Sequence, residues 1–202
     1  MRLEKALSMR NLENNPSSSA AGERQGVFVS PEIMKDRVAA SLASQKRLEV
    51  LARYQIMDTP AEPQFDALVV RASAACETPM AMITLLDDRR QWFKARVGTD
   101  LRETPIEHAL CTRALNYPDE VTVVTDARYD DRFLKNPAVT GPLRIRFYAA
   151  APIITTDGVP IGTLCVIDRE PRHLPKAKRD LLQALAREAA SLIEAGRGRL
   201  CS

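Results

Sequence analysis

Apolar positions recur at helical spacing in three stretches of the chain. The clearest follows Pro175 and predicts a long amphipathic helix, whose apolar stripe is Leu181, Leu182, Leu185, Ala186, Ala189, Leu192 and Ile193. A second helix is predicted from Glu62 to Cys76, with an apolar stripe of Phe65, Leu68, Val69 and Ala72. An earlier helix with a less regular stripe begins at Ser30-Pro31, because serine is a good N-cap and proline suits the first helical position. It is expected to end before Asp58.

Short apolar runs of strand length lie between the second and the last helix. The runs 80–86 and 91–97 are joined by the polar turn Asp87-Asp88-Arg89-Arg90, which predicts an antiparallel hairpin. Strict alternation in the second run places Phe93, Ala95 and Val97 on one face, and Trp92, Lys94 and Arg96 on the other. We expect Asp87 and Asp168, which end two central strands, to hold turns.

A second hairpin is predicted from the runs 147–154 and 161–167. Thr156-Asp157-Gly158 separates them, and an Asp-Gly pair between apolar runs is a strong hairpin signal because glycine accepts the positive φ of a tight turn. The intervening stretch 99–141 has a broken pattern, in which only a helix over 107–116 and a brief strand over 121–124 are expected.

This order of elements predicts an α+β fold with a mostly antiparallel central sheet. The first, second and last helices are expected on one face of the sheet, and the irregular middle segment on the other, with a ligand cleft beneath it. We expect four parts: a disordered N-terminal tail over 1–30, a helical extension over 31–46, one domain over 47–195 that includes the last helix, and a short tail over 196–202. No fused effector domain is expected after the last helix.

Composition narrows the class of protein without naming an activity. The chain has 202 residues, 29 of them basic and 26 acidic, and the net charge of +3 is too small to predict a nucleic-acid partner. No apolar run reaches the roughly 18 residues that span a bilayer, and no secretory leader is recognisable, so a cytoplasmic location is expected. The four cysteines are widely spaced and are expected to be free thiols. With only two histidines, no metal centre is expected.

Short motifs spread from Arg47 to Asp168 occur together in one known family. They are Arg47-Leu48, Tyr54 to Pro60, Phe65-Asp66, Leu86-Asp87, Arg90 to Lys94, Leu110-Cys111, Val124 to Ala127, Asp131-Arg132-Phe133, Arg146 to Ala149 and Gly162 to Asp168. On these residues the chain resembles a bacterial GAF domain, most closely the subclass found beside histidine kinases and diguanylate cyclases. The family fold is a central antiparallel sheet with helices behind it and a ligand cleft in front.

The resemblance implies a sensor and not an enzyme. It implies a stand-alone module that binds a small molecule of unknown identity and signals through homodimerisation of its flanking helices or through a separate partner, such as a histidine kinase or a diguanylate cyclase. A scaffold or dimerisation module without a ligand remains an alternative. No cofactor is indicated, because GAF ligands range from cyclic nucleotides and bilins to haem and 2-oxoacids, and a fold alone does not select among them.

Arginines and aromatic residues form the first group of candidate ligand-binding side chains. They are Trp92, Arg96, Arg132, Phe133, Arg146 and Tyr148, which would suit a carboxylate or phosphate in an electropositive cleft. The alternative is a scaffold role, with Asp131 pairing with Arg146 and Arg132 pairing with Asp126.

His108 and Cys111 form the second candidate group. Three residues apart on one helix, they would face the same side and suit an activated thiol or a bilin attachment point. The alternative is that Cys111 packs against the sheet while His108 caps or lines the helix start. The cyclic-nucleotide signature of Asn-Lys, Phe and Asp-Glu is absent. A thiol enzyme similar to the free methionine sulfoxide reductases is a further alternative, in which Cys111 and Cys165 would react if the fold brings them together.

Overall fold

A computed structural model describes the backbone of residues 31–197 and the side chains of residues 43–196. The predicted N-terminal tail over 1–30 lies outside the described residues, as do residues 198–202. The last helix continues to Arg197 and so includes the first residues of the expected C-terminal tail.

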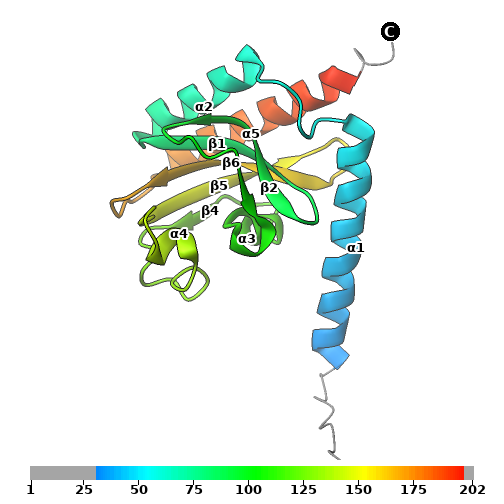
Figure 1. Ribbon diagram of the computed structural model, residues 1–202, viewed down its shortest axis with the longest axis horizontal. Helices are drawn as coiled ribbons and strands as arrows, with labels where there is room; N and C mark the ends of the chain where they lie inside the picture. The colour runs from blue at the N-terminus through cyan, green and yellow to red at the C-terminus, as the bar shows by residue number, and fades with distance from the viewer. Residues whose placement is uncertain (1–30, 198–202) are drawn as a thin grey trace, which may run out of the picture.

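The centre of the molecule is a six-stranded sheet in the order β3-β2-β1-β6-β5-β4 (Figure 1). All of its neighbouring strands run antiparallel, as the sequence predicts. The strands are β1 (Met80–Leu86), β2 (Arg90–Val97), β3 (Glu103–Pro105), β4 (Thr122–Val124), β5 (Phe147–Ile154) and β6 (Pro160–Asp168). Together with the helices, this sheet confirms the predicted α+β class.

Three longer helices and three short helical segments complete the fold. The longer ones are α1 (Pro31–Tyr54), α2 (Pro63–Cys76) and α5 (Lys176–Arg197). The middle segment contributes the 3-10 helix η1 (Ile106–His108), α3 (Cys111–Leu115) and α4 (Pro137–Thr140). The single helix expected over 107–116 is therefore divided into η1 and α3, and α4 was not predicted.

Helices α2 and α5 cover one face of the sheet, while η1, α3 and α4 lie on the other (Figure 1). The face under α2 and α5 holds one apolar core, which also receives Val50, Leu51 and Tyr54 from the end of α1. The expectation that the first helix covers the sheet is correct only for this end, because the rest of α1 runs past the domain in Figure 1.

The apolar stripe of α5 is used inside this core. Leu182, Leu185, Ala189 and Ile193 are all buried against the sheet and α2, whereas Leu181 remains exposed. This packing agrees with the interpretation that α5 covers the sheet.

A β-bulge in the first hairpin overturns the predicted faces of β2. Ile83 pairs with Ala95 and Thr84 with Phe93, so Lys94 is an extra residue in the strand. Trp92 and Ala95 consequently lie in the core under the helices, and Phe93 lies in the core on the opposite face. The strict alternation of Phe93, Ala95 and Val97 was wrong because one extra residue reverses every later position.

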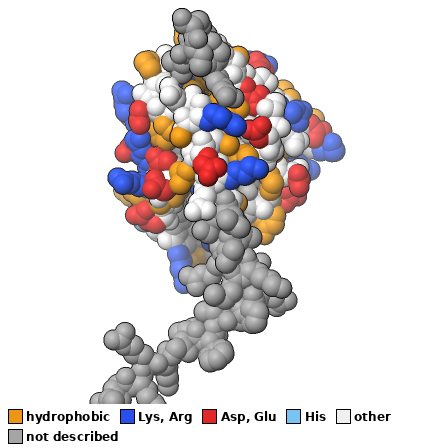
Figure 2. Space-filling model, turned by 90° about the vertical axis from the view of Figure 1, so that its right-hand side faces the viewer, with side chains coloured by type: hydrophobic (Ala, Val, Ile, Leu, Met, Phe, Trp, Pro, Cys, Tyr) orange, Lys and Arg blue, Asp and Glu red, His pale blue; other side chains and the backbone are white. Residues whose placement is uncertain are grey.

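Surface charges of both signs are interspersed over the face shown in Figure 2, with apolar side chains scattered between them. Among the described residues no helix has the length and apolar character needed to cross a membrane.

Candidate functional site

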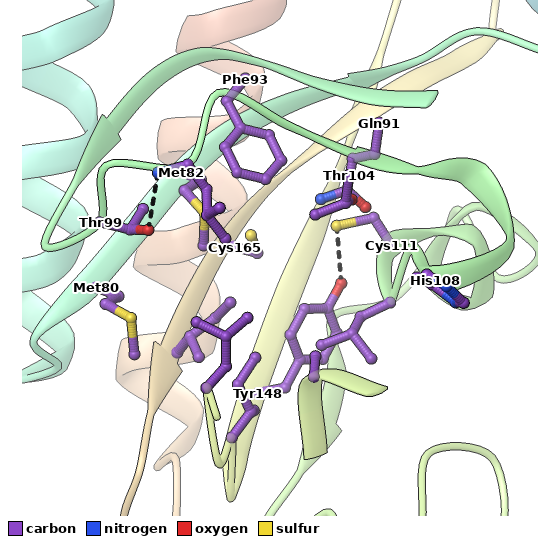
Figure 3. Close-up of a pocket in the computed structure, with 16 residues that line it drawn as sticks. Met80, Met82, Gln91, Phe93, Thr99, Thr104, His108, Cys111, Tyr148 and Cys165 are labelled. Carbon is purple, nitrogen blue, oxygen red and sulfur yellow. Dashed lines mark hydrogen bonds between the residues drawn. The ribbon is translucent and has the colours of Figure 1, made fainter. Parts of the chain in front are cut away.

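A small pocket lies between the sheet and the middle segment (Figure 3). Its volume is about 60 Å³, which is room for roughly four water molecules at about 15 Å³ each. Most of its lining is apolar. The lining residues are Met80, Met82, Gln91, Phe93, Thr99, Leu101, Thr104, His108, Leu110, Cys111, Ala138, Leu143, Ile145, Tyr148, Cys165 and Ile167.

The strands position the floor of the pocket through their alternation. Met80 and Met82 lie on the same face of β1, and Gln91 and Phe93 on the same face of β2. Cys165 stands opposite Met82 on the neighbouring strand β6. The central strands therefore supply most of the apolar floor and three of its sulfur atoms, those of Met80, Met82 and Cys165.

Asn136 connects two parts of the segment that covers the pocket. Its Oδ1 accepts a hydrogen bond of 2.8 Å from the Ala138 amide and so caps α4. Its Nδ2 donates to the His108 carbonyl at 3.0 Å, at the end of η1. This one side chain thus joins the α4 side of the pocket to the η1 side.

Gln91 is the lining residue whose hydrogen bonding is incomplete. Its side chain is buried, with the residue 6% exposed, and its Oε1 has no hydrogen-bond partner among the described residues. Leaving a buried amide oxygen unpaired costs about 1–3 kcal/mol, so such an atom in a pocket wall indicates an unfilled acceptor for a ligand donor or a water.

The sulfur of Cys111 is the centre of a buried polar cluster at the same pocket. It accepts hydrogen bonds from Thr163 at 3.0 Å, Tyr148 at 3.2 Å and Thr84 at 3.4 Å. Hydrogen bonding with the Cys165 side chain, which lines the same pocket, also lowers the pKa of Cys111. Figure 3 shows the bond from Tyr148. These hydrogen bonds would stabilise a negative charge on the Cys111 sulfur.

The two thiols of this cluster differ in acidity. Burial raises the pKa of Cys111, but hydrogen bonds from Cys165, Thr163, Thr84 and Tyr148 outweigh it and lower that pKa to about 7. The pKa of Cys165 is raised well above its ordinary value by its hydrogen bond to Cys111 and by burial. Burial also raises the pKa of Tyr148, which stays a neutral donor.

Three of the predicted site residues line this pocket, and they are His108, Cys111 and Tyr148. His108 is exposed at its edge, at the end of η1, and Cys111 begins α3, so the two do not share one helix as expected. Phe133 lies behind the wall, with its ring 5.9 Å from that of Tyr148.

The other predicted residues lie elsewhere. Trp92 is in the core under the helices, and Arg96 borders surface hollows on the α2 side of β2. Arg132 pairs with Asp130 and not with Asp126. Arg146 donates to the carbonyls of Val139 and Ile145, in place of the expected pairing with Asp131. The pocket is consequently not the electropositive cleft that the arginines suggested.

Gln91 was not among the predicted site residues, although the sequence holds a signal for it. Gln91 precedes Phe93 by two residues and therefore shares its face of the strand, where a polar side chain among apolar ones marks either a partner or a site. Met80 and Met82 carried no comparable signal, because methionine is an ordinary core residue.

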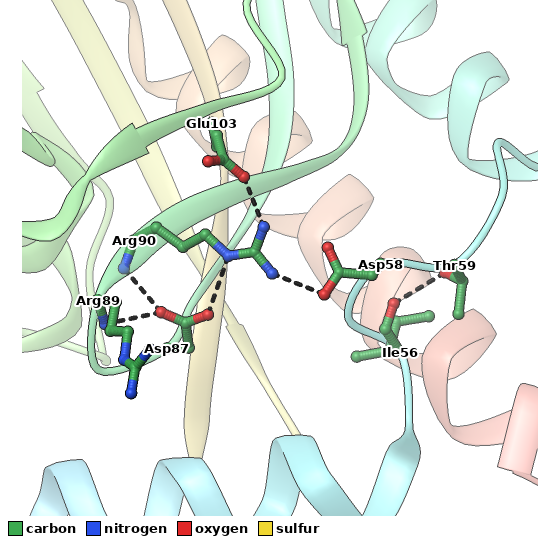
Figure 4. A network of polar contacts seen from close by, with 7 residues as sticks. All are labelled: Ile56, Asp58, Thr59, Asp87, Arg89, Arg90 and Glu103. Carbon is green, nitrogen blue, oxygen red and sulfur yellow. Dashed lines mark hydrogen bonds and ion pairs between the residues drawn. The ribbon is translucent and has the colours of Figure 1, made fainter.

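A second polar cluster is centred on Arg90, the first residue of β2, and has a structural explanation. Arg90 contacts Asp58 at 2.6 Å, Glu103 at 2.5 Å and Asp87 at 3.2 Å (Figure 4). It thereby ties the α1–α2 connection and β3 to the β1–β2 turn. Within residues 43–196 no group of three or more His, Cys, Asp or Glu side chains is placed to hold a metal ion.

The predicted turn roles of Asp87 and Asp168 are confirmed. Asp87 accepts from the amides of Arg89 at 2.8 Å and Arg90 at 2.7 Å. Asp168 accepts from the amide of Glu170 at 3.0 Å.

Comparison with known proteins identifies the same fold and domain. The family model for the GAF domain matches residues 60–193. A GAF domain of a phosphoenolpyruvate-protein phosphotransferase from Coxiella burnetii superposes with a TM-score of 0.58 at 18% identity, covering 80% of this chain and 99% of that one. The blue-light absorbing PixJ GAF domain of Thermosynechococcus elongatus gives 0.53 at 21% identity, covering 73% and 88%.

One curated relative is more similar in sequence. A cyclic di-GMP phosphodiesterase of Pseudomonas aeruginosa is 44% identical over 126 residues, which are 62% of this chain and 21% of that protein. The chain therefore spans about a fifth of the length of this relative.

Proposed function

The chain belongs to the GAF domain family, and on that premise we propose that it is a non-catalytic sensory module that binds a small uncharged molecule in the pocket beneath η1, α3 and α4. The proposed unit spans residues 47–195, with a helical extension over 31–46. The observation that carries the proposal is the unpaired Oε1 of Gln91 in the wall of an otherwise apolar pocket. A ligand with one N–H or O–H donor would satisfy it.

The lining favours a neutral ligand over a charged one. Within the described part of the chain no Lys, Arg, Asp or Glu lines the pocket, and burying an unpaired charge costs far more than burying a hydrogen-bonded polar group. The carboxylate or phosphate ligand expected from the arginines therefore gives way to a neutral molecule with an apolar body. Its size is limited to a few non-hydrogen atoms unless the covering segment moves.

We place the module in signalling by cyclic dinucleotides. The support is the 44% identity to part of a cyclic di-GMP phosphodiesterase. Its output would pass through homodimerisation or through a separate signalling enzyme, such as a histidine kinase or a diguanylate cyclase. Because the apolar stripe of α5 is already buried, a dimer would use α1 or the polar face of α5.

A scaffold without a ligand is the second candidate function, and the small volume of the pocket favours it. In that case a few waters occupy the cavity and one of them pairs with Gln91. The two candidates differ in what happens when small molecules are added.

The test is a thermal-shift screen of the full chain with two panels. One panel holds small uncharged alcohols, amides and aldehydes, and the other holds carboxylates, phosphates and cyclic nucleotides. Since a ligand of the native state raises its stability by about 2.7 kcal/mol at a hundred times Kd, we expect at least one uncharged compound to raise the melting temperature. Stabilisation by the charged panel alone, or by no compound, refutes the ligand proposal, and the second outcome supports the scaffold.

A matched pair of variants locates the binding. Ala138→Leu adds three carbon atoms to the lining of the pocket and is expected to abolish the shift. Ala195→Leu makes the same change on the exposed surface of α5 and is expected to keep it. A ligand that stabilises both variants equally binds elsewhere.

A further inference from the structure

Cys111 and Cys165 line the same pocket, and we propose that they form a peroxide-reactive thiol pair that closes to a disulfide. This reactivity goes beyond ligand sensing and does not depend on it. It requires a hydroperoxide as oxidant, and it makes the pocket an access route to the pair.

The two cysteines come from different parts of the chain. Cys111 is the first residue of α3, and Cys165 lies in the middle of β6, against which α3 packs. Both thiols are unbridged and line the same pocket, and hydrogen bonding with the Cys165 side chain lowers the pKa of Cys111. The Cys111 sulfur already contacts β6, because it accepts a hydrogen bond of 3.0 Å from Thr163, two residues before Cys165 on the same face of the strand. The short helix α3 would have to bring Cys111 to the Cα separation of about 4.4–6.8 Å from Cys165 that a disulfide requires.

The pocket gives a small oxidant its path. Cys111 is 1% exposed and Cys165 0%, so neither is reached from the outer surface. Both nevertheless line the pocket, whose other lining residues include the exposed Leu101 and His108. A volume of about 60 Å³ admits hydrogen peroxide and excludes bulky disulfides such as oxidised glutathione.

The environment of Cys111 suits the first step. Its sulfur is surrounded by the hydroxyls of Thr84, Tyr148 and Thr163 at 3.0–3.4 Å, and these donors favour the thiolate that attacks peroxides. Among residues 43–196, whose side chains the structure describes, the titratable groups that line the pocket are Cys111, Cys165, Tyr148 and His108, and none is Lys, Arg, Asp or Glu.

The oxidation of the two thiols to a disulfide takes place in two steps. The Cys111 thiolate attacks one oxygen of the hydroperoxide, the O–O bond breaks, and the leaving alkoxide takes up a proton, which gives a sulfenic acid and an alcohol, or water from hydrogen peroxide. The Cys165 sulfur then attacks the Cys111 sulfur, the S–O bond breaks, and the hydroxide leaves as water with the Cys165 proton. The two thiols lose two electrons in total and the peroxide gains them.

The order of the steps follows from the effect of Cys111 on the acidity of Cys165. Hydrogen bonding to Cys111 is the largest cause that raises the pKa of Cys165, so Cys165 is unreactive while Cys111 is a thiolate. Conversion of Cys111 to a neutral sulfenic acid removes that negative charge and allows Cys165 to ionise. Cys111 is therefore the residue that is oxidised first, and Cys165 is the one that then forms the disulfide with it.

Cys76 provides an internal control. It lies in the core under α2, on the other side of the sheet, and is 4% exposed. Burial is the main cause that raises its pKa, and it does not line the pocket.

The experiment treats the reduced full-length chain with a small excess of hydrogen peroxide in a Cys201→Ser background, which removes the cysteine outside the described residues. Mass spectrometry of the intact chain and of a non-reducing digest is expected to show the loss of two hydrogen atoms and a Cys111–Cys165 linked peptide. Dimedone, which captures sulfenic acids, is expected to label Cys111 at least about tenfold faster than Cys76, since thiolate character controls the rate.

Two variants separate the roles of the thiols. Cys165→Ser is expected to accumulate the sulfenic acid on Cys111, and Cys111→Ser to leave Cys165 reduced. Cys76→Ser is expected to form the disulfide as the unmodified chain does. Equal labelling of Cys76 and Cys111, or no linked peptide in the parent chain, overturns the proposal, and both of these readouts use the protein without a change at the pair.

Discussion

At the scale of single residues, the buried side chain of Lys94 explains the bulge in β2. The extra residue of β2 has a fully buried side chain, and its Nζ donates to Thr59 Oγ1 at 2.7 Å, Pro60 O at 2.8 Å and Glu62 Oε1 at 2.6 Å. All three ammonium hydrogens thus bind the α1–α2 connection or the start of α2. The buried charge is matched by acceptors, as a buried ammonium must be.

We predict that Lys94→Met destabilises the protein by about 3 kcal/mol, because it removes one partner of a largely buried ion pair and its hydrogen bonds. Urea unfolding measures the change. Lys176→Met is the control, since the exposed pair of Lys176 with Asp180 is expected to contribute less than about 0.5 kcal/mol. Similar losses in the two variants would contradict the structural role of Lys94.

The lowered pKa of Asp87 predicts how the stability of the protein depends on pH. Burial raises this pKa, but the amides of Arg89 and Arg90 and the Arg90 guanidinium outweigh burial, so the pKa lies below the ordinary value of an aspartate. A carboxylate with a lowered pKa contributes stability above its unfolded pKa, and this contribution is lost as the pH falls through the folded value.

Asp87→Asn is therefore expected to cost about 1 kcal/mol at pH 7, with a difference from the parent chain that shrinks as the pH falls below about 4. Urea unfolding at pH 7, 5, 4 and 3 measures it. Asp88→Asn changes an exposed carboxylate in the same turn and is expected to have little effect. A difference for Asp87→Asn that stays constant to pH 3 would refute the account.

The candidate site also shows what single residues in a sequence reveal. His108, Cys111 and Tyr148 were predicted as site residues and line the pocket, but the arginines chosen with them lie outside it. Arginine and aspartate close in sequence, such as Arg132 and Asp130, satisfy each other locally. The sequence does not indicate which arginines form such local ion pairs and are therefore not available to a ligand.

At the scale of elements, Gly162 fixes the contact between β6 and β1. A Cβ placed on it would lie 1.9 Å from the Thr84 carbonyl oxygen, which belongs to the backbone and cannot turn aside. The glycine is thus required by the close approach of two central strands. Gly158 is required for a different reason, since its φ of +74° shapes the β5–β6 turn while a Cβ would meet open space.

The two glycines make a matched pair of substitutions. Gly162→Ala is expected to cost about 3 kcal/mol or more, because the strands must move apart. Gly158→Ala is expected to cost about 1 kcal/mol, because it strains only the turn. Thermal or urea unfolding measures both, and a Gly158 variant as unstable as the Gly162 variant would show that the strand contact is not the cause.

Element positions were predictable where a period was uninterrupted. The spacing of apolar residues in α2 and α5 and the Asp-Gly turn located both helices and the second hairpin. The bulge at Lys94 was not predictable, because its reason is a set of acceptors 32–35 positions earlier in the chain. The prediction for the middle segment was incomplete for a similar reason. The positions of η1, α3 and α4 depend on tertiary hydrogen bonds, such as the one from Asn136 to the His108 carbonyl.

At the scale of the whole molecule, the sheet has two faces with different tasks. The face under α2 and α5 is a closed core of aliphatic and aromatic side chains. The face under η1, α3 and α4 is also apolar, but it contains Gln91, Cys111 and Tyr148 around a cavity. Burying a polar group without a hydrogen-bond partner lowers the stability of the fold. The polar groups on this second face are therefore the reason why we assign the function to it.

The central claim is that a small uncharged molecule binds against Gln91. The most direct test is the NMR spectrum of the ¹⁵N-labelled protein, in which the side-chain amide of Gln91 is observed while the uncharged compound with the largest thermal shift is added. The account predicts that this signal moves in proportion to occupancy and that Ala138→Leu abolishes the movement. A Gln91 signal that stays in place while amides of α1 or α5 move would place the ligand elsewhere and contradict the account.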